Sequence, residues 1–195
     1  MIRIYLAMVD MIPAAVVLIP LFLILCGTVY RRNIWQSVFC CLFCLYLSAV
    51  FSLVGIPNIL YFRPDVNLNL IPIYGIVADL QNSLLNIVLF VPLGCFLPIL
   101  WSRFRKFAPV VFFGFGLSVF IELLQMLTFR ATDVNDLITN LVGTVIGFLL
   151  IKPVSHKCHA AGEGRWDVYA LCGLSFGIMF FLHPFLSPLL WDRIL

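Results

Sequence analysis

Six apolar segments divide the chain, and short polar stretches between them hold most of its charged residues. The segments run approximately over 11–30, 34–54, 84–100, 107–127, 137–151 and 168–185. Most approach the roughly 20 residues that a helix needs to cross a hydrocarbon core of about 30 Å. Because lipid offers no hydrogen-bond partner to a backbone amide, each segment is predicted to be helical. The pattern predicts an all-α, polytopic transmembrane helix bundle of about six spans, with five as the alternative.

Two connections refine this picture. The fifth segment is short, so its helix is predicted either to start earlier, near Val134, or to lie in a locally thinned bilayer. The longest connection, 55–83, holds three prolines but is too apolar for a solvated linker. It is predicted to lie in the membrane interface or to dip back towards the helices. No soluble domain or internal repeat is evident, so residues 1–195 are interpreted as one integral membrane domain.

Composition supports a membrane location. The chain is 63% hydrophobic and 11% charged, against roughly 25% charged in an ordinary soluble domain, and its mean hydropathy is +1.11. The bilayer is therefore the first predicted partner. A net charge of +3, scattered along the chain, argues against binding nucleic acid. Most of the seven cysteines fall within apolar runs and are interpreted as packing residues.

Basic residues predict the orientation. The first, third and fifth connections (31–33, 101–106 and 152–167) hold eight lysines and arginines, whereas the second and fourth hold two, Arg63 and Arg130. Loops rich in lysine and arginine stay on the cytoplasmic side of a membrane. The three basic loops are therefore predicted to be cytoplasmic in a multi-pass protein, with the second and fourth connections outside.

Glu122 is the most informative residue for function, because it lies inside the fourth apolar segment. An ionisable side chain near the bilayer centre costs on the order of 2.5–3.5 kcal/mol on insertion scales, so it must face the protein interior, pair or be protonated. Gln125 follows three residues later on the same predicted helical face. The pair is interpreted either as a functional site or as a hydrogen-bonded contact that holds helices together.

A second polar group follows around the start of the fifth segment. Asp133, Asp136 and Asn140 have helical spacing, and Arg130 precedes them. Asp133 is predicted to cap the helix, with Asp136 supporting its first turn through the helix dipole. Asn140 lies deeper in the apolar run. Two carboxylates three residues apart are a weak signal for a divalent cation, so neither a metal site nor a cofactor is predicted.

Asn86, in the third segment, extends this polar set to a third helix. Pro92 and Gly94 follow it and are predicted to kink that helix, with breaks near Pro92 and Pro98. With alternating crossings, Asn86, Glu122, Gln125 and Asn140 would all lie near the outer leaflet. Scattered structural residues would not be expected to share one side. The sequence therefore predicts one outward-opening polar cluster, which comprises Asn86, Glu122, Gln125, Arg130, Asp133, Asp136 and Asn140.

Small residues predict close helix packing. Gly143 and Gly147 form one GxxxG pair, and Gly173 and Gly177 form another. Such pairs let two membrane helices approach closely.

The motifs carry a resemblance to a known family. The first block is Asn69-Leu-Ile-Pro72 and Asn86-Ile-Val-Leu-Phe-Val-Pro-Leu-Gly94 with Leu97-Pro98, and the second is Glu122-Leu-Leu-Gln125 followed by Arg130, Thr132-Asp133-Val134, Asp136-Leu-Ile, Asn140, Gly143 and Gly147. Over about 35–152 these blocks resemble the VanZ-like family. The resemblance implies a multi-pass protein of the bacterial cell membrane. The family's namesake is associated with resistance to teicoplanin, a glycopeptide antibiotic that carries a lipid tail.

Three functions stay open at this point, since the resemblance implies a phenotype and not a reaction. The first is a non-enzymatic envelope protein that limits the action of lipoglycopeptides at the outer surface. The second is a membrane enzyme acting on a lipid-linked or cell-wall precursor, with Glu122 and Asp136 as the candidate catalytic residues and Arg130 binding a phosphate or carboxylate. The third is a small transporter or flippase with Glu122 as its protonatable group.

Overall fold

The computed structural model describes residues 12–21, 23, 34–60, 68–69, 79–128, 132–155 and 167–194. Several sequence predictions concern residues outside these ranges. They are the position of Arg130, most of the connection 55–83, the second half of the first apolar segment and the loop that follows residue 155. The described chain falls into two compact units, residues 1–62 with 164–195 (unit 1) and residues 63–163 (unit 2). The assignment of 1–195 to one domain stays a prediction.

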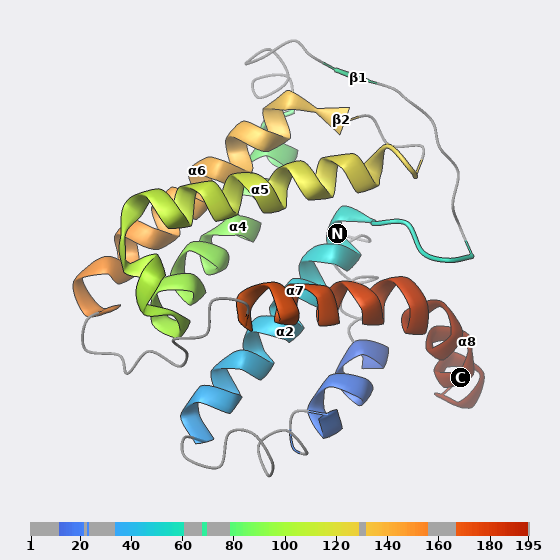
Figure 1. The fold of residues 1–195 in the computed structure, drawn as a ribbon. Helices are drawn as coiled ribbons and strands as arrows, with labels where there is room; N and C mark the ends of the chain where they lie inside the picture. Colours follow the sequence, from blue (N-terminus) through green and yellow to red (C-terminus); the bar gives the residue numbers. More distant parts are fainter. Residues whose placement is uncertain are drawn as a thin grey trace. The chain divides into compact units, whose positions relative to one another are not determined.

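The described residues are almost entirely helical (Figure 1). In chain order the elements are α2 (Ile34–Val54), β1 (Leu68–Asn69), α4 (Leu80–Leu100), the 3₁₀ turn η1 (Ser102–Arg105), α5 (Phe107–Gln125), β2 (Thr132–Asp133), α6 (Val134–Ser155), α7 (Asp167–Gly177), the π-helical turn η2 (Ile178–Leu182) and α8 (His183–Ile194). A shorter apolar helix covers Ile12–Leu21.

Five helical stretches of the described chain are long and apolar enough to cross a membrane. They are Ser37–Val54, Leu80–Leu100, Phe107–Gln125, Val134–Ser155 and Asp167–Leu189. This confirms a polytopic helical membrane protein with five such spans. The earlier start predicted for the fifth apolar segment is also confirmed, because α6 begins at Val134.

In unit 1, α2 packs against α7 through buried small polar groups. The Ser175 hydroxyl donates to the Cys44 carbonyl at 3.3 Å, and the Cys44 thiol donates to the Leu171 carbonyl at 3.8 Å. Each helix thereby provides a backbone hydrogen-bond acceptor for a buried polar side chain of the other. Helix α2 is followed by Gly55, whose φ is positive, at 68°. The amides of Gly55 and Ile56 both donate to the Phe51 carbonyl at 3.2 Å.

The last helix of unit 1 changes its winding near a proline. The chain stays helical from α7 through the π-helical turn η2 into α8. Pro184 has no N–H to give to the Phe180 carbonyl one turn earlier. The amide of Ile59 donates to that carbonyl instead, at 3.2 Å. A bond from another part of the chain thus replaces the helical bond that the proline removes.

In unit 2, α4 and α6 run parallel and lie backbone to backbone. A Cβ added at Gly143 would collide with the carbonyl of Ile87, and one at Gly147 would collide with the carbonyl of Val91. On the other helix, a Cβ at Gly94 would collide with the carbonyl of Thr144. The close approach predicted from Gly143 and Gly147 is confirmed, with Gly94 as its counterpart on α4.

The second glycine pair does not behave in this way. A Cβ at Gly173 or Gly177 would meet no described atom within 4 Å. The prediction that this pair brings helices together is wrong for the described part of the chain.

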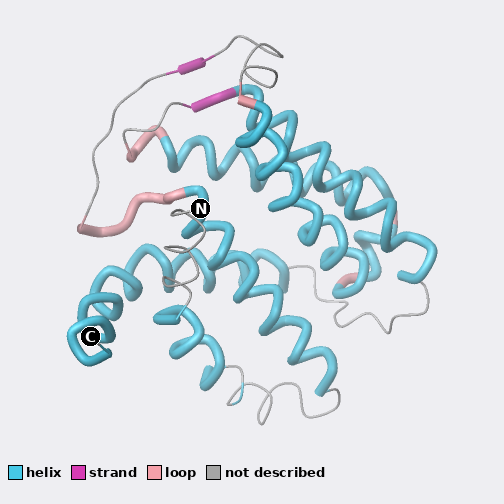
Figure 2. Tube along the Cα trace, turned by 180° about the vertical axis from the view of Figure 1, so that it is seen from behind, coloured by secondary structure: helices cyan, strands magenta, loops and turns pink. Residues whose placement is uncertain are grey.

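The breaks predicted near Pro92 and Pro98 are not found, whereas the kink predicted at Pro92 and Gly94 stays a prediction. Helix α4 is continuous from Leu80 to Leu100 through both Pro92 and Pro98 (Figure 2). Each proline removes a single intrahelical hydrogen bond. Close packing of Gly94 against α6 holds the backbone between them, so the loss does not interrupt the helix.

Helix α5 returns antiparallel to α4 after the turn η1, and α6 then runs back along both. Gly114 and Ser118 of α5 lie against Thr144 and Asn140 of α6, respectively, which fixes the antiparallel register. The end of α5 therefore lies beside the beginning of α6. At that end β1 and β2 form a two-residue parallel pair, with Leu68 opposite Thr132 and Asn69 opposite Asp133.

Candidate functional site

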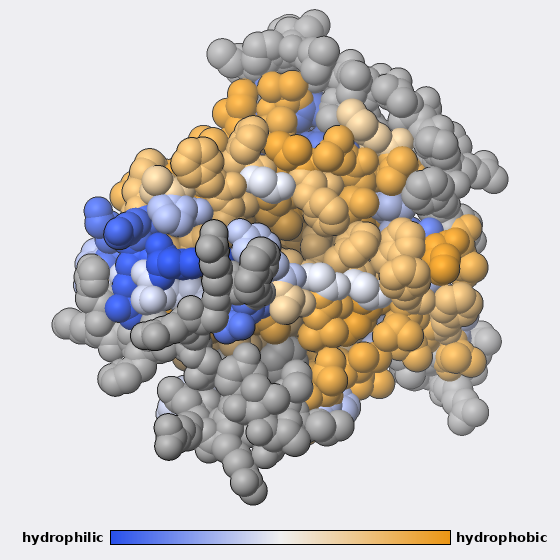
Figure 3. Space-filling model, in the orientation of Figure 1, coloured by the Kyte–Doolittle hydropathy of each residue, from blue (hydrophilic) through white to orange (hydrophobic). Residues whose placement is uncertain are grey.

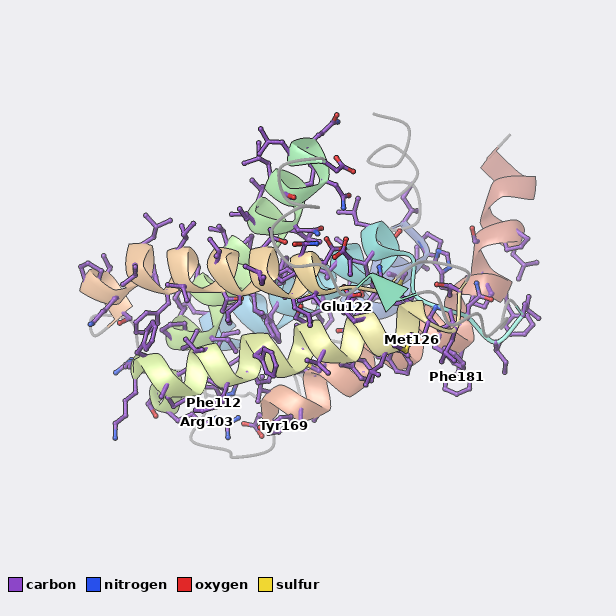
Figure 4. The ribbon with its side chains drawn as sticks, turned by 90° about the horizontal axis from the view of Figure 1, so that it is seen from above. Arg103, Phe112, Glu122, Met126, Tyr169 and Phe181 are labelled. Carbon is purple, nitrogen blue, oxygen red and sulfur yellow. The ribbon has the colours of Figure 1, made fainter. Side chains whose placement is uncertain are left out.

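The link from α5 to α6 is built around Glu122. Its side chain is 3% exposed, and its Oε2 accepts the backbone N–H of Asp133 at 3.1 Å. This bond gives the buried backbone amide of Asp133 an acceptor inside the apolar unit. Glu122 therefore holds the residue from which α6 starts, and Figure 4 shows it towards the same end of α5 as Met126.

Asp133 is the cap of α6, as the sequence predicts. Its Oδ1 accepts the backbone N–H of Asn135 at 2.9 Å and the Asn135 side-chain amide at 2.6 Å. This arrangement satisfies one of the amides that a helix leaves unpaired at its beginning. Asp136 lies half-buried in the first turn, where a carboxylate interacts favourably with the helix dipole.

Deeper in the unit, Asn140 joins α6 to α5. Its Nδ2 donates to the Ser118 hydroxyl at 2.9 Å, and both residues are buried. Among the described residues, its Oδ1 has no hydrogen-bond partner. A buried acceptor without a partner is costly, about 1–3 kcal/mol. Side chains of a helix lean towards its N-terminus, so Asn140 leans towards the turn that carries Asp136.

The two remaining predicted site residues in the described ranges, Gln125 and Asn86, differ in how far their side chains are buried. Gln125 is 5% exposed on the same face of α5 as Glu122, and its backbone carbonyl accepts the Thr128 hydroxyl at 3.0 Å. Asn86 is half-buried on α4 next to Ile87, whose carbonyl faces Gly143. It thus lies at a depth similar to that of Asn140, and no described hydrogen bond joins it to the others.

The polar residues of three helices therefore lie towards one end of unit 2. The register of α4 against α6 and the contact of Glu122 with Asp133 place Asn86, Glu122, Gln125, Asp133, Asp136 and Asn140 there. We call this the polar end of unit 2. Arg130 belongs to the same connection but lies outside the described residues.

Comparison with models of protein families shows which family the chain belongs to. The model of the VanZ/LLP1 family matches residues 38–155, which include most of α2 and all of α4, α5 and α6. The chain belongs to the VanZ/LLP1 family. Comparisons with curated proteins and with solved structures find no match.

The VanZ/LLP1 region contains further buried polar residues that were not among the predicted site residues. Ser83, Ser118, Asn135, Thr139 and Thr144 are all buried in unit 2. Thr139 and Thr144 donate to the carbonyls of Asn135 and Asn140, each at 3.0 Å, so they satisfy themselves within α6. For Ser118 a signal exists, because residues 118, 122 and 125 share one face of α5.

The chemistry of the polar end in this VanZ/LLP1 protein is dominated by acceptors. Glu122, Asp133 and Asp136 bring carboxylates, and the Asn140 side chain brings an unused carbonyl oxygen. No group of three or more His, Cys, Asp or Glu side chains in the described ranges is placed to hold a metal ion. Such a set suits a ligand that offers several N–H or O–H donors.

Proposed function

We propose that this VanZ/LLP1 protein is a non-enzymatic protein of the bacterial envelope. In this proposal the polar end of unit 2 faces outwards and reduces the action of lipid-tailed glycopeptides such as teicoplanin. The observation that carries the proposal is the buried, acceptor-rich cluster around Glu122. A carboxylate buried in a membrane helix marks a functional position more often than a packing position.

The charges of unit 2 support the outward orientation. Arg103, Arg105 and Lys106 lie between α4 and α5, and Lys152 lies in the last turn of α6. These residues belong to the end opposite to Glu122, and Figure 4 shows Arg103 and Glu122 towards different ends of α5. Because basic ends stay in the cytoplasm, the polar end is the outer one in this proposal.

The acceptors also agree with the ligand class. Glycopeptides carry sugar hydroxyls and peptide N–H groups, which are donors for the carboxylates and for the Asn140 carbonyl. Apolar side chains beside the cluster face the surroundings, since Leu123 is 54% and Phe120 40% exposed. A lipid tail lying along α5 would cover them and gain from their burial.

Expression in a susceptible bacterium tests this function. We expect the wild-type protein to raise the inhibitory concentration of teicoplanin more than that of vancomycin, because vancomycin lacks the lipid tail. Cells with the empty vector are the control, and membrane levels of the protein are measured in parallel. Equal susceptibility of expressing and control cells would remove the proposal.

A second candidate is an enzyme that acts on a lipid-linked or cell-wall precursor. Its supporting observation is that Glu122 is held in place by the Asp133 amide inside an apolar unit, as a general acid or base would be. Profiles of lipids and cell-wall precursors that differ between wild type and Glu122→Gln would favour it. Unchanged profiles together with an altered antibiotic response would favour the non-enzymatic function. The transporter loses one supporting observation, since α4 is continuous through Pro92 and Pro98.

A further inference from the structure

The end of unit 2 opposite to Glu122 is basic. The turn η1 carries Arg103 and Arg105, Lys106 follows it directly, and Lys152 lies in the last turn of α6. No Asp or Glu occurs between residues 101 and 121 or between residues 137 and 155. Figure 3 shows hydrophilic residues gathered where η1 and the beginning of α5 lie. We call these four residues the basic end of unit 2.

Two of the four basic side chains lie close to aromatic rings. The Arg103 guanidinium lies 4.5 Å from the centroid of the buried Phe104 ring. The Lys152 Nζ lies 5.8 Å from the centroid of the Phe148 ring, which in turn contacts Phe107 at 5.7 Å between ring centroids. Cation–π contacts of this kind restrain long side chains near the ring. These contacts favour positions of both charges close to the ends of their helices.

The beginning of α5 adds a further positive feature. The helix is 19 residues long, and Lys106, at its N-cap position, makes no side-chain capping bond. The first amides of a helix have no partner within the helix, and the helix dipole adds partial positive charge there. Such an end attracts phosphate groups. Here it lies within the segment that also carries Arg103, Arg105 and Lys106.

The apolar surroundings point to a lipid as the source of the phosphate. On α5, Phe107 is 51% and Phe112 75% exposed, and on α6, Leu149 is 55% and Leu150 65% exposed. These side chains lie within two turns of the basic residues, so acyl chains attached to a bound phosphate would cover them. A soluble phosphate ion would leave them unchanged.

We propose that the basic end of unit 2 binds the phosphate of an anionic phospholipid, of which phosphatidylglycerol is the test case. Arg103, Arg105, Lys106 and Lys152 supply the positive charge. At the start of α5 the amides of Phe107 and Ala108 supply backbone N–H donors, because the next residue, Pro109, has none. This inference does not depend on the antibiotic-related function, because it concerns the other end of the unit.

Titration of the purified protein in detergent with phosphatidylglycerol tests the proposal. Native mass spectrometry would follow bound lipid for the wild type and for the double variant Arg103→Gln/Arg105→Gln. Each basic residue near an anionic surface contributes to binding, so we expect the double variant to bind roughly tenfold more weakly. The matched control is Arg31→Gln/Arg32→Gln, which removes the same charge from another basic loop and should bind as the wild type does.

Three outcomes would overturn the proposal. They are equal weakening in both double variants, equal binding of phosphatidylcholine and phosphatidylglycerol, and displacement of the lipid by millimolar inorganic phosphate. If Arg103→Gln/Arg105→Gln does not fold, the exposed pair Lys106→Gln/Lys152→Gln replaces it. An unchanged affinity in that pair would equally reject the site.

Discussion

Gly147→Ala is expected to lower the melting temperature of the purified protein by several degrees. The added Cβ would collide with the Val91 carbonyl and lie 3.1 Å from the Cys95 amide nitrogen. Both are backbone atoms of α4, which cannot turn away as the end of a flexible side chain could. The two helices must separate, and overpacking of this kind costs about 1–3 kcal/mol. Thermal unfolding in detergent measures the effect.

Gly116→Ala is the matched control on α5. A Cβ at Gly116 would meet no described atom within 4 Å, and alanine is favoured over glycine inside a helix by roughly 0.5–1 kcal/mol. We therefore expect an unchanged or slightly higher melting temperature for this variant. A Gly147→Ala protein as stable as Gly116→Ala would contradict the backbone contact between α4 and α6.

The second large effect is expected at Glu122, where two substitutions separate the negative charge of the side chain from its hydrogen-bond acceptor. Glu122→Gln keeps an oxygen that can accept the Asp133 amide, now bonded at 3.1 Å, so the variant should fold. Glu122→Leu removes the acceptor, and leaving a buried amide without a partner costs about 1–3 kcal/mol. We expect a melting temperature near wild type for the glutamine variant and a clearly lower one for the leucine variant.

In cells, Glu122→Gln is expected to lose the teicoplanin response while its membrane level is unchanged. The reason is that the ligand's donors would then meet a neutral amide in place of a carboxylate. Ile146→Ala, at a side chain that is 38% exposed on α6 and away from the polar end, is the control and should keep the response. A full response in Glu122→Gln would show that the carboxylate is not the functional group.

Much of unit 2 could be predicted from the sequence because its signals are local. The apolar runs define α4, α5 and α6 to within a few residues. The start of α6 at Val134 follows from the length that a span requires and from Asp133, whose Oδ1 accepts the Asn135 amide at 2.9 Å. Burial of Glu122 and Gln125 on one face follows from their spacing of three residues.

Other features depend on partners that are distant in sequence. The pairs Gly143/Gly147 and Gly173/Gly177 are the same motif, yet only the first lies against a helix backbone. Which pair is used depends on where α4 lies, and the motif holds no information about that. In the same way Ser118 bonds Asn140, 22 residues away, whereas a serine in a membrane helix can also satisfy itself on its own backbone.

Proline shows the opposite error, in which a local signal was given too much weight. Pro92 and Pro98 each remove one hydrogen bond from α4, and in isolation this loss predicts a break. Within the unit, however, Gly94 packs on the backbone of α6 between them. Tertiary packing therefore keeps α4 continuous, and the local rule fails.

The functional proposal requires the polar end of unit 2 to face the outside of the cell. Two exposed residues test this directly, with Gln81→Cys in the first turn of α4, at the polar end, and Ser102→Cys in η1, at the basic end. Both are made in a Cys158→Ser background, because Cys158 lies in a polar loop of the sequence. The background protein alone is the control for labelling of the remaining cysteines.

Intact cells are treated with a membrane-impermeant maleimide, and labelling is compared with that of opened cells. We expect Gln81→Cys to react in intact cells and Ser102→Cys to react only after the cells are opened. The reverse pattern, with Ser102→Cys labelled from outside and Gln81→Cys protected, would contradict an outward-facing polar site.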